Sequence, residues 1–114
     1  MRVLEFKVDR QTISKQPGCD FSGLVAGSNG YLRAKFNFVG PEWEGTDKLA
    51  AFWISDRKHG VALDENDECD IPSQVLVATE FRVQVIGRRK FERARFGIET
   101  NSYRVKQLPA ENKY

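Results

Sequence analysis

The chain has 114 residues, of which 40% are hydrophobic and 30% charged, and its formal net charge is +2. This composition argues against wholesale disorder and against a dedicated polyanion binder, and the length predicts one domain. Residues 49–54 form the longest apolar run. That run is far shorter than the ~20 residues that cross a bilayer, so we expect no membrane association.

The first predicted strand lies at the amino terminus. Charged and apolar residues alternate over residues 3–8, which predicts a strand and not the apolar core of a signal peptide. We therefore expect synthesis in the cytoplasm. Residues 9–30 are rich in Gly and Pro, and they predict loops with short strands near residues 12–14 and 24–26.

The clearest strand pattern lies in the middle of the chain. Apolar residues occupy alternate positions over residues 31–39, and a second apolar segment follows at residues 48–54 after a break rich in Gly, Pro and Glu. The break gives the chain the means to turn back on itself, so this part of the chain predicts an antiparallel β-domain. One buried cluster across two facing sheets is predicted to contain Leu32, Ala34, Phe36, Phe38, Phe52, Phe81, Val83 and Val85.

The remaining segments continue this scheme to the carboxyl end. Tight turns are predicted at residues 56–60, 64–68 and 87–90, one helical turn at residues 72–76, and strands at residues 61–63, 69–71, 81–86, 91–96 and 103–108. The fold class is therefore all-β, an antiparallel sandwich or small barrel. We predict one domain over residues 1–108 and a short flexible tail over residues 109–114.

No residue pattern predicts catalysis, a metal site or a cofactor. His59 is the only histidine, and its predicted turn position supplies no catalytic partner. The acidic segment 64–68 begins like a calcium loop, but Cys69 and Val75 stand where such a loop needs Gly and Glu. It is predicted to be a solvated turn. Cys19 and Cys69 have no metal-binding spacing, and without a secretory signal we expect both to be reduced thiols.

A cluster of basic residues follows the strand at residues 81–86. Arginine interleaved with aromatic residues on a hairpin is one way to grip single-stranded nucleic acid. The alternative is that these charges are the wet face of a strand and a solvated turn. We regard nucleic acid as an unfavoured partner, because acidic residues nearly balance the basic ones. The candidate basic patch is Arg88, Arg89, Lys90, Arg93 and Arg95.

The segment 49–54 is apolar on both of its faces. If Phe52 faces the core, then Leu49, Ala51 and Trp53 face the other way, where an antiparallel sheet is normally wet. Either the loop 9–30 covers these three residues or another subunit does. They form the candidate interface, through which we expect self-association.

Several short motifs resemble one family. The chain resembles the amino-terminal domain of siphophage baseplate upper proteins and related small phage tail proteins. The resemblance rests on Leu24 to Ser28, Tyr31-Leu32, Ala34-x-Phe36-x-Phe38, Trp43-x-Gly45, Lys48-x-Ala50-x-Phe52, Cys69-x-Ile71-Pro72, Val75-Leu76, the strand from Phe81 to Gly87, and Thr100-Asn101.

The resemblance implies an immunoglobulin-like β-sandwich that serves as a non-enzymatic building block of a virion. It implies a structural role for Trp43, which would pack over one end of the sandwich, and for Gly45, which would permit a turn. Other virion proteins would be the partners, and the virion the final location. Two alternatives remain: a carbohydrate-binding module that presents Tyr31, Trp43 and Trp53, and a single-stranded nucleic-acid binder that uses the Arg88–Arg95 hairpin.

Overall fold

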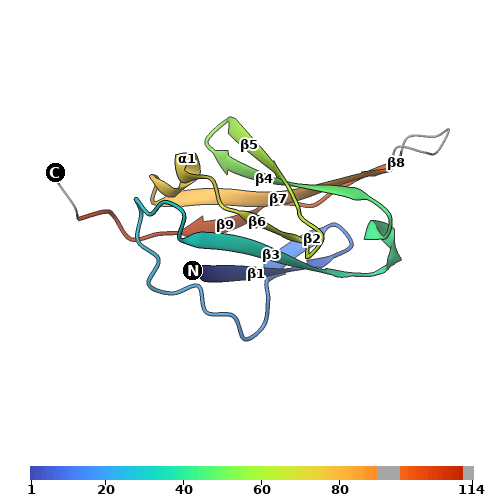
Figure 1. Cartoon of the computed structure of the whole chain (residues 1–114), viewed down its shortest axis with the longest axis horizontal. Coiled ribbons are helices and arrows are strands. Elements are labelled where there is room, and N and C mark those ends of the chain that lie inside the picture. Colours follow the sequence, from blue (N-terminus) through green and yellow to red (C-terminus); the bar gives the residue numbers. More distant parts are fainter. Residues whose placement is uncertain (90–95, 112–114) are drawn as a thin grey trace.

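The computed structural model describes residues 1–89 and 96–111 and shows two β-sheets packed face to face (Figure 1). One sheet has the strand order β2 (Thr12–Lys15), β1 (Arg2–Asp9), β3 (Leu32–Val39), β6 (Glu68–Asp70). The other has the order β5 (Arg57–Ala62), β4 (Asp47–Ile54), β7 (Glu80–Arg89), β8 (Phe96–Glu99), and β9 (Tyr103–Lys106) also pairs with β7. The 3-10 turn η1 (Pro41–Trp43) and the helical turn α1 (Ser73–Leu76) complete the described elements. The predicted fold class, a single immunoglobulin-like β-sandwich, is confirmed.

One pairing differs from the predicted antiparallel scheme. β1 and β3 run parallel over their whole length, from Arg2 opposite Leu32 to Asp9 opposite Val39. Parallel neighbours need a crossover of about a dozen residues or more, and residues 16–31 provide it. The backbone N–H of Arg2 donates to the carbonyl of Tyr31 at 2.9 Å, which aligns the two strand starts.

The core lies between the sheets and contains the residues that the alternation predicts. Each strand turns its apolar residues inward because successive side chains point to opposite faces. Phe38 is the exception, since it is only partly buried and packs at the edge of the core. The other seven predicted residues are at most 2% exposed: Leu32, Ala34, Phe36, Phe52, Phe81, Val83 and Val85.

Trp43 closes one end of the sandwich. Its side chain is 1% exposed, its indole N–H donates to the carbonyl of Arg10 at 2.8 Å, and its ring lies 4.9 Å from that of Phe38. Gly87 on β7 lies under the ring, where an added Cβ would stand 2.8 Å from Trp43 Cζ3. Gly45 has φ +70°, a left-handed conformation that glycine adopts without strain. The structural roles expected for Trp43 and Gly45 are confirmed.

Three local predictions are wrong. The turn predicted at residues 56–60 is instead a two-residue loop, Ser55 and Asp56, because Ile54 already pairs with Arg57. Ser55 takes φ +51°, which makes so tight a hairpin possible. Residues 24–26 form no strand but one isolated parallel bridge, Val25 to Leu108. The predicted turn at residues 87–90 is strand as far as Arg89.

β1 begins, and the chain leaves β9, at the same end of the sandwich (Figure 1). Leu108 is tied to the body, since its N–H donates to the carbonyl of Leu24 at 2.7 Å. Residues 109–111 are exposed, and residues 112–114 of the predicted tail lie outside the described residues. The division into a domain at 1–108 and a tail at 109–114 stays a prediction.

Candidate functional site

The candidate interface lies on the outer face of the five-stranded sheet. Leu49, Ala51 and Trp53 point away from the core, opposite to the buried Ala50 and Phe52. The register places three cross-strand rows side by side: Ala62–Leu49–Ile86, Gly60–Ala51–Gln84 and Lys58–Trp53–Arg82. We call these nine residues the β4 face.

Residues of the neighbouring strands β5 and β7 cover part of Leu49, Ala51 and Trp53. Ala51 is 0% exposed, whereas Leu49 and Trp53 are half-buried. Leu49 lies across Gly60, where an added Cβ would stand 3.0 Å from Leu49 Cδ2. The loop 9–30, one of the two covers considered from the sequence, packs elsewhere, since its Phe21 ring lies 5.2 Å from that of Phe6.

Trp53 is held between two cations and an amide. Its indole N–H donates to Gln84 Oε1 at 3.1 Å. Lys58 Nζ lies 5.9 Å from the ring centroid and Arg82 Cζ 5.5 Å from it. Since β5 and β7 flank β4, the cations approach from the two neighbouring strands. The ring is therefore fixed in place, and cations stand where another planar group would stack.

A shallow groove of about 310 Å³ runs beside Leu49. Its apolar floor is made by Leu49, Ala62 and Ile86, and Lys58 and Arg88 stand along it. Asp47 lies opposite Arg88 in the register. The groove beside the β4 face thus has an apolar floor and a margin of three cations, Lys48, Lys58 and Arg88, and one carboxylate, Asp47.

Two cations of this face lack a carboxylate partner among the described residues. Lys58 contacts the Trp53 ring, and Arg82 contacts the same ring and donates to the carbonyl of Ser55 at 2.7 Å. Arg82 also stands directly opposite Arg104 of β9. Like charges opposite each other destabilise a sheet, and Glu80 offsets part of this by pairing with Arg104 at 3.4 Å.

Sequence reasoning missed Lys58 and Arg82 as members of the site. The alternation over residues 81–85 could have identified Arg82, because it places that residue opposite to the core-facing Phe81 and Val83. Lys58 was missed because residues 56–60 were predicted to form a turn, whereas Lys58 lies on β5 and pairs with Trp53.

The outer face of the four-stranded sheet is different, because its arginine is paired within the chain. Arg33 contacts three carboxylates: Asp70 at 2.7 Å, Asp64 at 3.1 Å and Glu68 at 3.5 Å. Asn37 in turn donates to Glu5 at 3.3 Å and to Gln16 at 3.1 Å. The Arg33 charge is therefore already satisfied within the chain, whereas Lys7 and Lys35 on the same face form no ion pair among the described residues.

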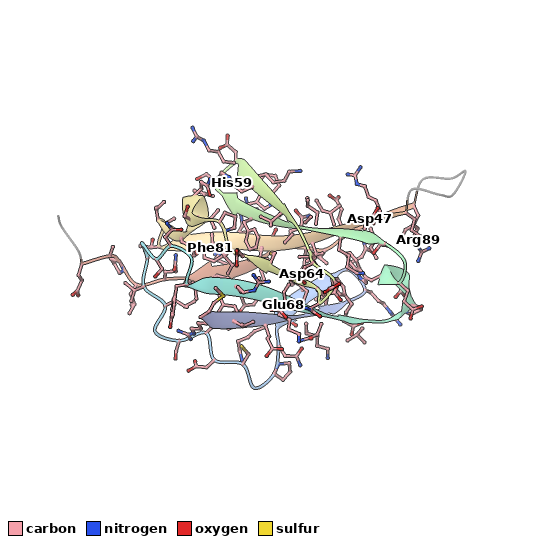
Figure 2. The ribbon with its side chains drawn as sticks, in the orientation of Figure 1. Asp47, His59, Asp64, Glu68, Phe81 and Arg89 are labelled. Carbon is pink, nitrogen blue, oxygen red and sulfur yellow. The ribbon has the colours of Figure 1, made fainter. Side chains whose placement is uncertain are left out.

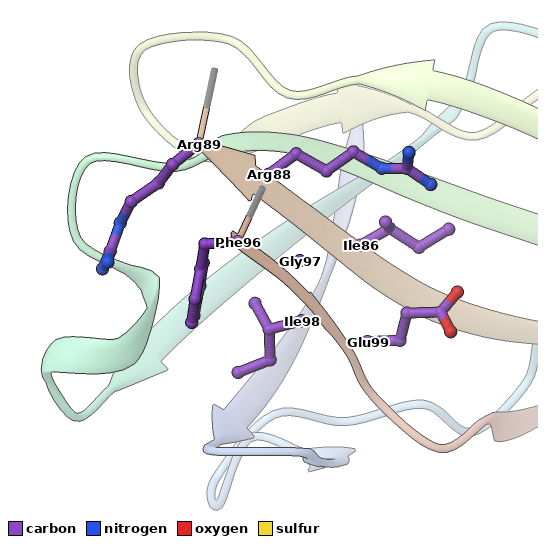
Figure 3. Close-up of a pocket in the computed structure, with 7 residues that line it drawn as sticks. All are labelled: Ile86, Arg88, Arg89, Phe96, Gly97, Ile98 and Glu99. Carbon is purple, nitrogen blue, oxygen red and sulfur yellow. The ribbon is translucent and has the colours of Figure 1, made fainter. Parts of the chain in front are cut away.

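The candidate basic patch is only partly described. Lys90, Arg93 and Arg95 lie outside the described residues. Arg88 and Arg89 point to opposite sides of β7, where β7 and β8 border a cavity of about 520 Å³ (Figure 3). Arg89 stacks on Phe96, with Cζ 4.4 Å from the ring centroid, and donates to the carbonyls of Glu42 and Glu44. It thereby fastens the start of the hairpin to η1.

The acidic residues and the histidine do not meet. His59 lies on β5, opposite Phe52, and well away from Asp64 and Glu68 (Figure 2). Asp64 closes its own turn, since its carboxylate accepts from the backbone N–H groups of Asn66 at 2.8 Å and Glu68 at 3.0 Å. The Glu68 N–H first of all, together with Arg33, lowers the pKa of Asp64. No group of three potential ligands that could hold a metal occurs in the described residues.

Both cysteines are free thiols, as predicted. Cys69 faces the core from β6, opposite Ala34. Burial raises the pKa of Cys69 to about 12, so this thiol is unreactive in the folded protein.

The three aromatic residues considered for sugar stacking form no common platform. Trp43 is buried in the end of the sandwich, and Trp53 is flanked by Lys58 and Arg82. Tyr31 is 50% exposed but precedes β3, in the other sheet. Of these three rings, only that of Tyr31 is free to stack on a sugar.

No family model matches the chain, and no curated protein matches it. Among solved structures, the chain is similar to the N-terminal domain of phage TP901-1 ORF48, with a TM-score of 0.58 and 8% sequence identity. The match covers 97% of this chain and 100% of the other. In the described residues no helix is long and apolar enough to cross a membrane. The whole described sandwich therefore has the fold of a phage protein domain, as the resemblance in the sequence implied.

Proposed function

We propose that the protein is a non-enzymatic structural or assembly component of a phage or prophage particle, in its tail or baseplate. It acts by protein–protein contact through the β4 face, and its final location is the virion. The observation that carries this proposal is Trp53, a half-buried tryptophan on an open apolar sheet face with two cations that lack carboxylate partners among the described residues. The fold match to a phage domain supports the class of protein.

The character of the β4 face fits an interface. Tryptophan and arginine are the residues most enriched where a truncation costs binding energy. Trp53 and Arg82 lie in one row, and Leu49 and Ile86 supply apolar area beside them. Non-enzymatic action is consistent with the separation of His59 from Asp64 and Glu68 (Figure 2).

Mass spectrometry of purified particles tests the proposal directly. The chain should be present in particles of the phage or prophage whose genome encodes it. Its Leu49→Glu variant should fold but be lost from particles, because the new charge lies in the apolar groove. Val39→Glu is the matched control, since Val39 is 44% exposed on β3 in the other sheet. Absence of the parent chain from particles, or incorporation of both variants alike, would contradict the proposal.

A further inference from the structure

We propose that the β4 face binds an acidic surface of another protein, in which carboxylates stand beside an apolar side chain, and not a second copy of this chain. This inference rests on the proposed function and names the partner's chemistry at the same site. Three observations carry it: the row of cations beside Trp53, the lack of carboxylate partners for Lys58 and Arg82 in the described residues, and the pre-positioning of Arg82. The same charges argue against a second copy, and the acidic residues on this sheet argue against nucleic acid.

The cations have a fixed arrangement. Lys58 and Arg82 stand on the strands either side of Trp53, two strand spacings or about 10 Å apart at the backbone. Arg104 continues the row on β9. A partner that presents two carboxylates over this row would meet Lys58 and Arg82 with the Trp53 edge between them. The groove beside Leu49 would receive the apolar side chain.

Arg82 is already held for such a contact. Its guanidinium donates to the carbonyl of Ser55 at 2.7 Å and lies over the Trp53 ring. A side chain held in this way loses less conformational freedom when a carboxylate binds it. Guanidinium–carboxylate bonds are also among the stronger hydrogen bonds in proteins, because both groups are charged.

A second copy is disfavoured by the same charges. A twofold contact of the β4 face with itself about an axis along β4 would bring the Lys58–Trp53–Arg82 rows of two copies together. Like-charge contacts of this kind act against a partner. We therefore propose an acidic partner in place of the self-association that the sequence led us to expect.

Nucleic acid is also disfavoured, although it is anionic. Asp47, Glu80 and Glu99 stand on the outer side of the same sheet, where a continuous phosphate backbone would meet them. The stacking that single-stranded nucleic acid needs is limited by the cations beside Trp53. A short acidic protein surface can avoid these carboxylates, whereas a regular chain of phosphates cannot.

The two tryptophans allow a direct test by NMR. Each indole N–H gives one signal: Trp53 reports the β4 face, and the buried Trp43 is an internal reference. The probe is a blocked peptide of glutamate and leucine, compared with the same peptide in which lysine replaces glutamate and with an oligothymidine of similar length. We expect the acidic peptide to shift the Trp53 signal and leave that of Trp43 in place, and added salt to reverse the shift.

Charge variants locate the contact. Lys58→Gln and Arg82→Gln should each weaken binding of the acidic peptide about tenfold, the usual scale for a hydrogen bond to a charged group. Lys7→Gln on β1 removes the same charge from the outer face of the other sheet and should leave binding unchanged. The lysine peptide should not bind.

Three results would overturn the inference: stronger binding of oligothymidine than of the acidic peptide, equal effects of Lys7→Gln and Arg82→Gln, and concentration-dependent self-association abolished by Leu49→Glu in light scattering. The experiments distinguish failure of this inference from failure of the proposed function. A chain found in particles through the β4 face, with no acidic-peptide binding, refutes only the partner chemistry. A chain that binds the acidic peptide but is absent from particles refutes only the phage role.

Discussion

Gly87→Ala is expected to destabilise the protein because Trp43 occupies the space that a side chain at position 87 needs. An added Cβ would stand 2.8 Å from Trp43 Cζ3 and 3.1 Å from Thr46 Oγ1. Trp43 is 1% exposed and cannot swing into water, so the strain falls on the packed end of the sandwich. Overpacking of this kind costs about 1–3 kcal/mol. Alanine restricts the backbone of the unfolded chain more than glycine does. This lower entropy of the unfolded state offsets about 0.4–1 kcal/mol of the cost.

Gly97→Ala is the matched control on the neighbouring strand β8. The nearest atom to a Cβ there is the carbonyl oxygen of Gly87, at 4.0 Å. This variant should be neutral or slightly stabilised. Urea unfolding followed by circular dichroism measures both, and the Gly87→Ala protein should be less stable than the Gly97→Ala protein by roughly 1–3 kcal/mol. Equal stability of the two would refute the account of Trp43 as a rigid cover over Gly87.

Phe36→Ala should cost about 3–5 kcal/mol, as for other buried phenylalanines, whereas Val39→Ala at the exposed end of the same strand should stay within about 0.5 kcal/mol of the parent in urea unfolding. In native protein, a thiol reagent should label Cys19 first and Cys69 only on unfolding; equally fast labelling of both would contradict the burial of Cys69. The lowered pKa of Asp64 stabilises the fold above its ordinary value of 3.8, and this contribution is lost as the pH falls through the folded-state pKa. Asp64→Asn should therefore flatten the acid limb of a stability–pH profile, and an unchanged limb would contradict the turn contacts.

The core was predictable because it is encoded locally. The alternation over residues 32–38 and 81–85 assigns one face to the interior whatever the strand pairs with. Seven of the eight predicted core residues are accordingly buried. Phe38 is the exception, since it lies near the strand end, where Trp43 and Lys48 contact its ring but leave it partly exposed.

The hairpin between β4 and β5 was not predictable in the same way. Asp56, Lys58 and Gly60 have the composition of a turn, yet Lys58 and Gly60 pair with β4. The true loop depends on the positive φ of Ser55, a conformation uncommon for residues other than glycine. A side chain at position 60 would crowd Leu49 on the neighbouring strand, so glycine fits there. This contact between strands cannot be recognised from composition.

The partners of each strand were also beyond the sequence. β1 alternates equally well whether its neighbour is parallel or antiparallel, so nothing in residues 2–9 indicates the pairing with β3. The same limit applies to the candidate site. Leu49, Ala51 and Trp53 were identifiable from one strand, but the cations beside them come from β5 and β7, and only the register brings them together.

The contrast between the two outer faces decides which one a partner would use. On the four-stranded sheet, Arg33 is already surrounded by Asp64, Glu68 and Asp70, so an incoming carboxylate would have to displace one of these and gain little. On the five-stranded sheet, an incoming carboxylate would displace no described carboxylate from Lys58 or Arg82, whose contacts are the Trp53 ring and, for Arg82, the Ser55 carbonyl. Adding Leu49 and Ile86 gives this face apolar area, from which water is released at about 25 cal/mol per Å². Both terms favour association on the β4 face, where Lys58 and Arg82 flank Trp53 beside the apolar groove.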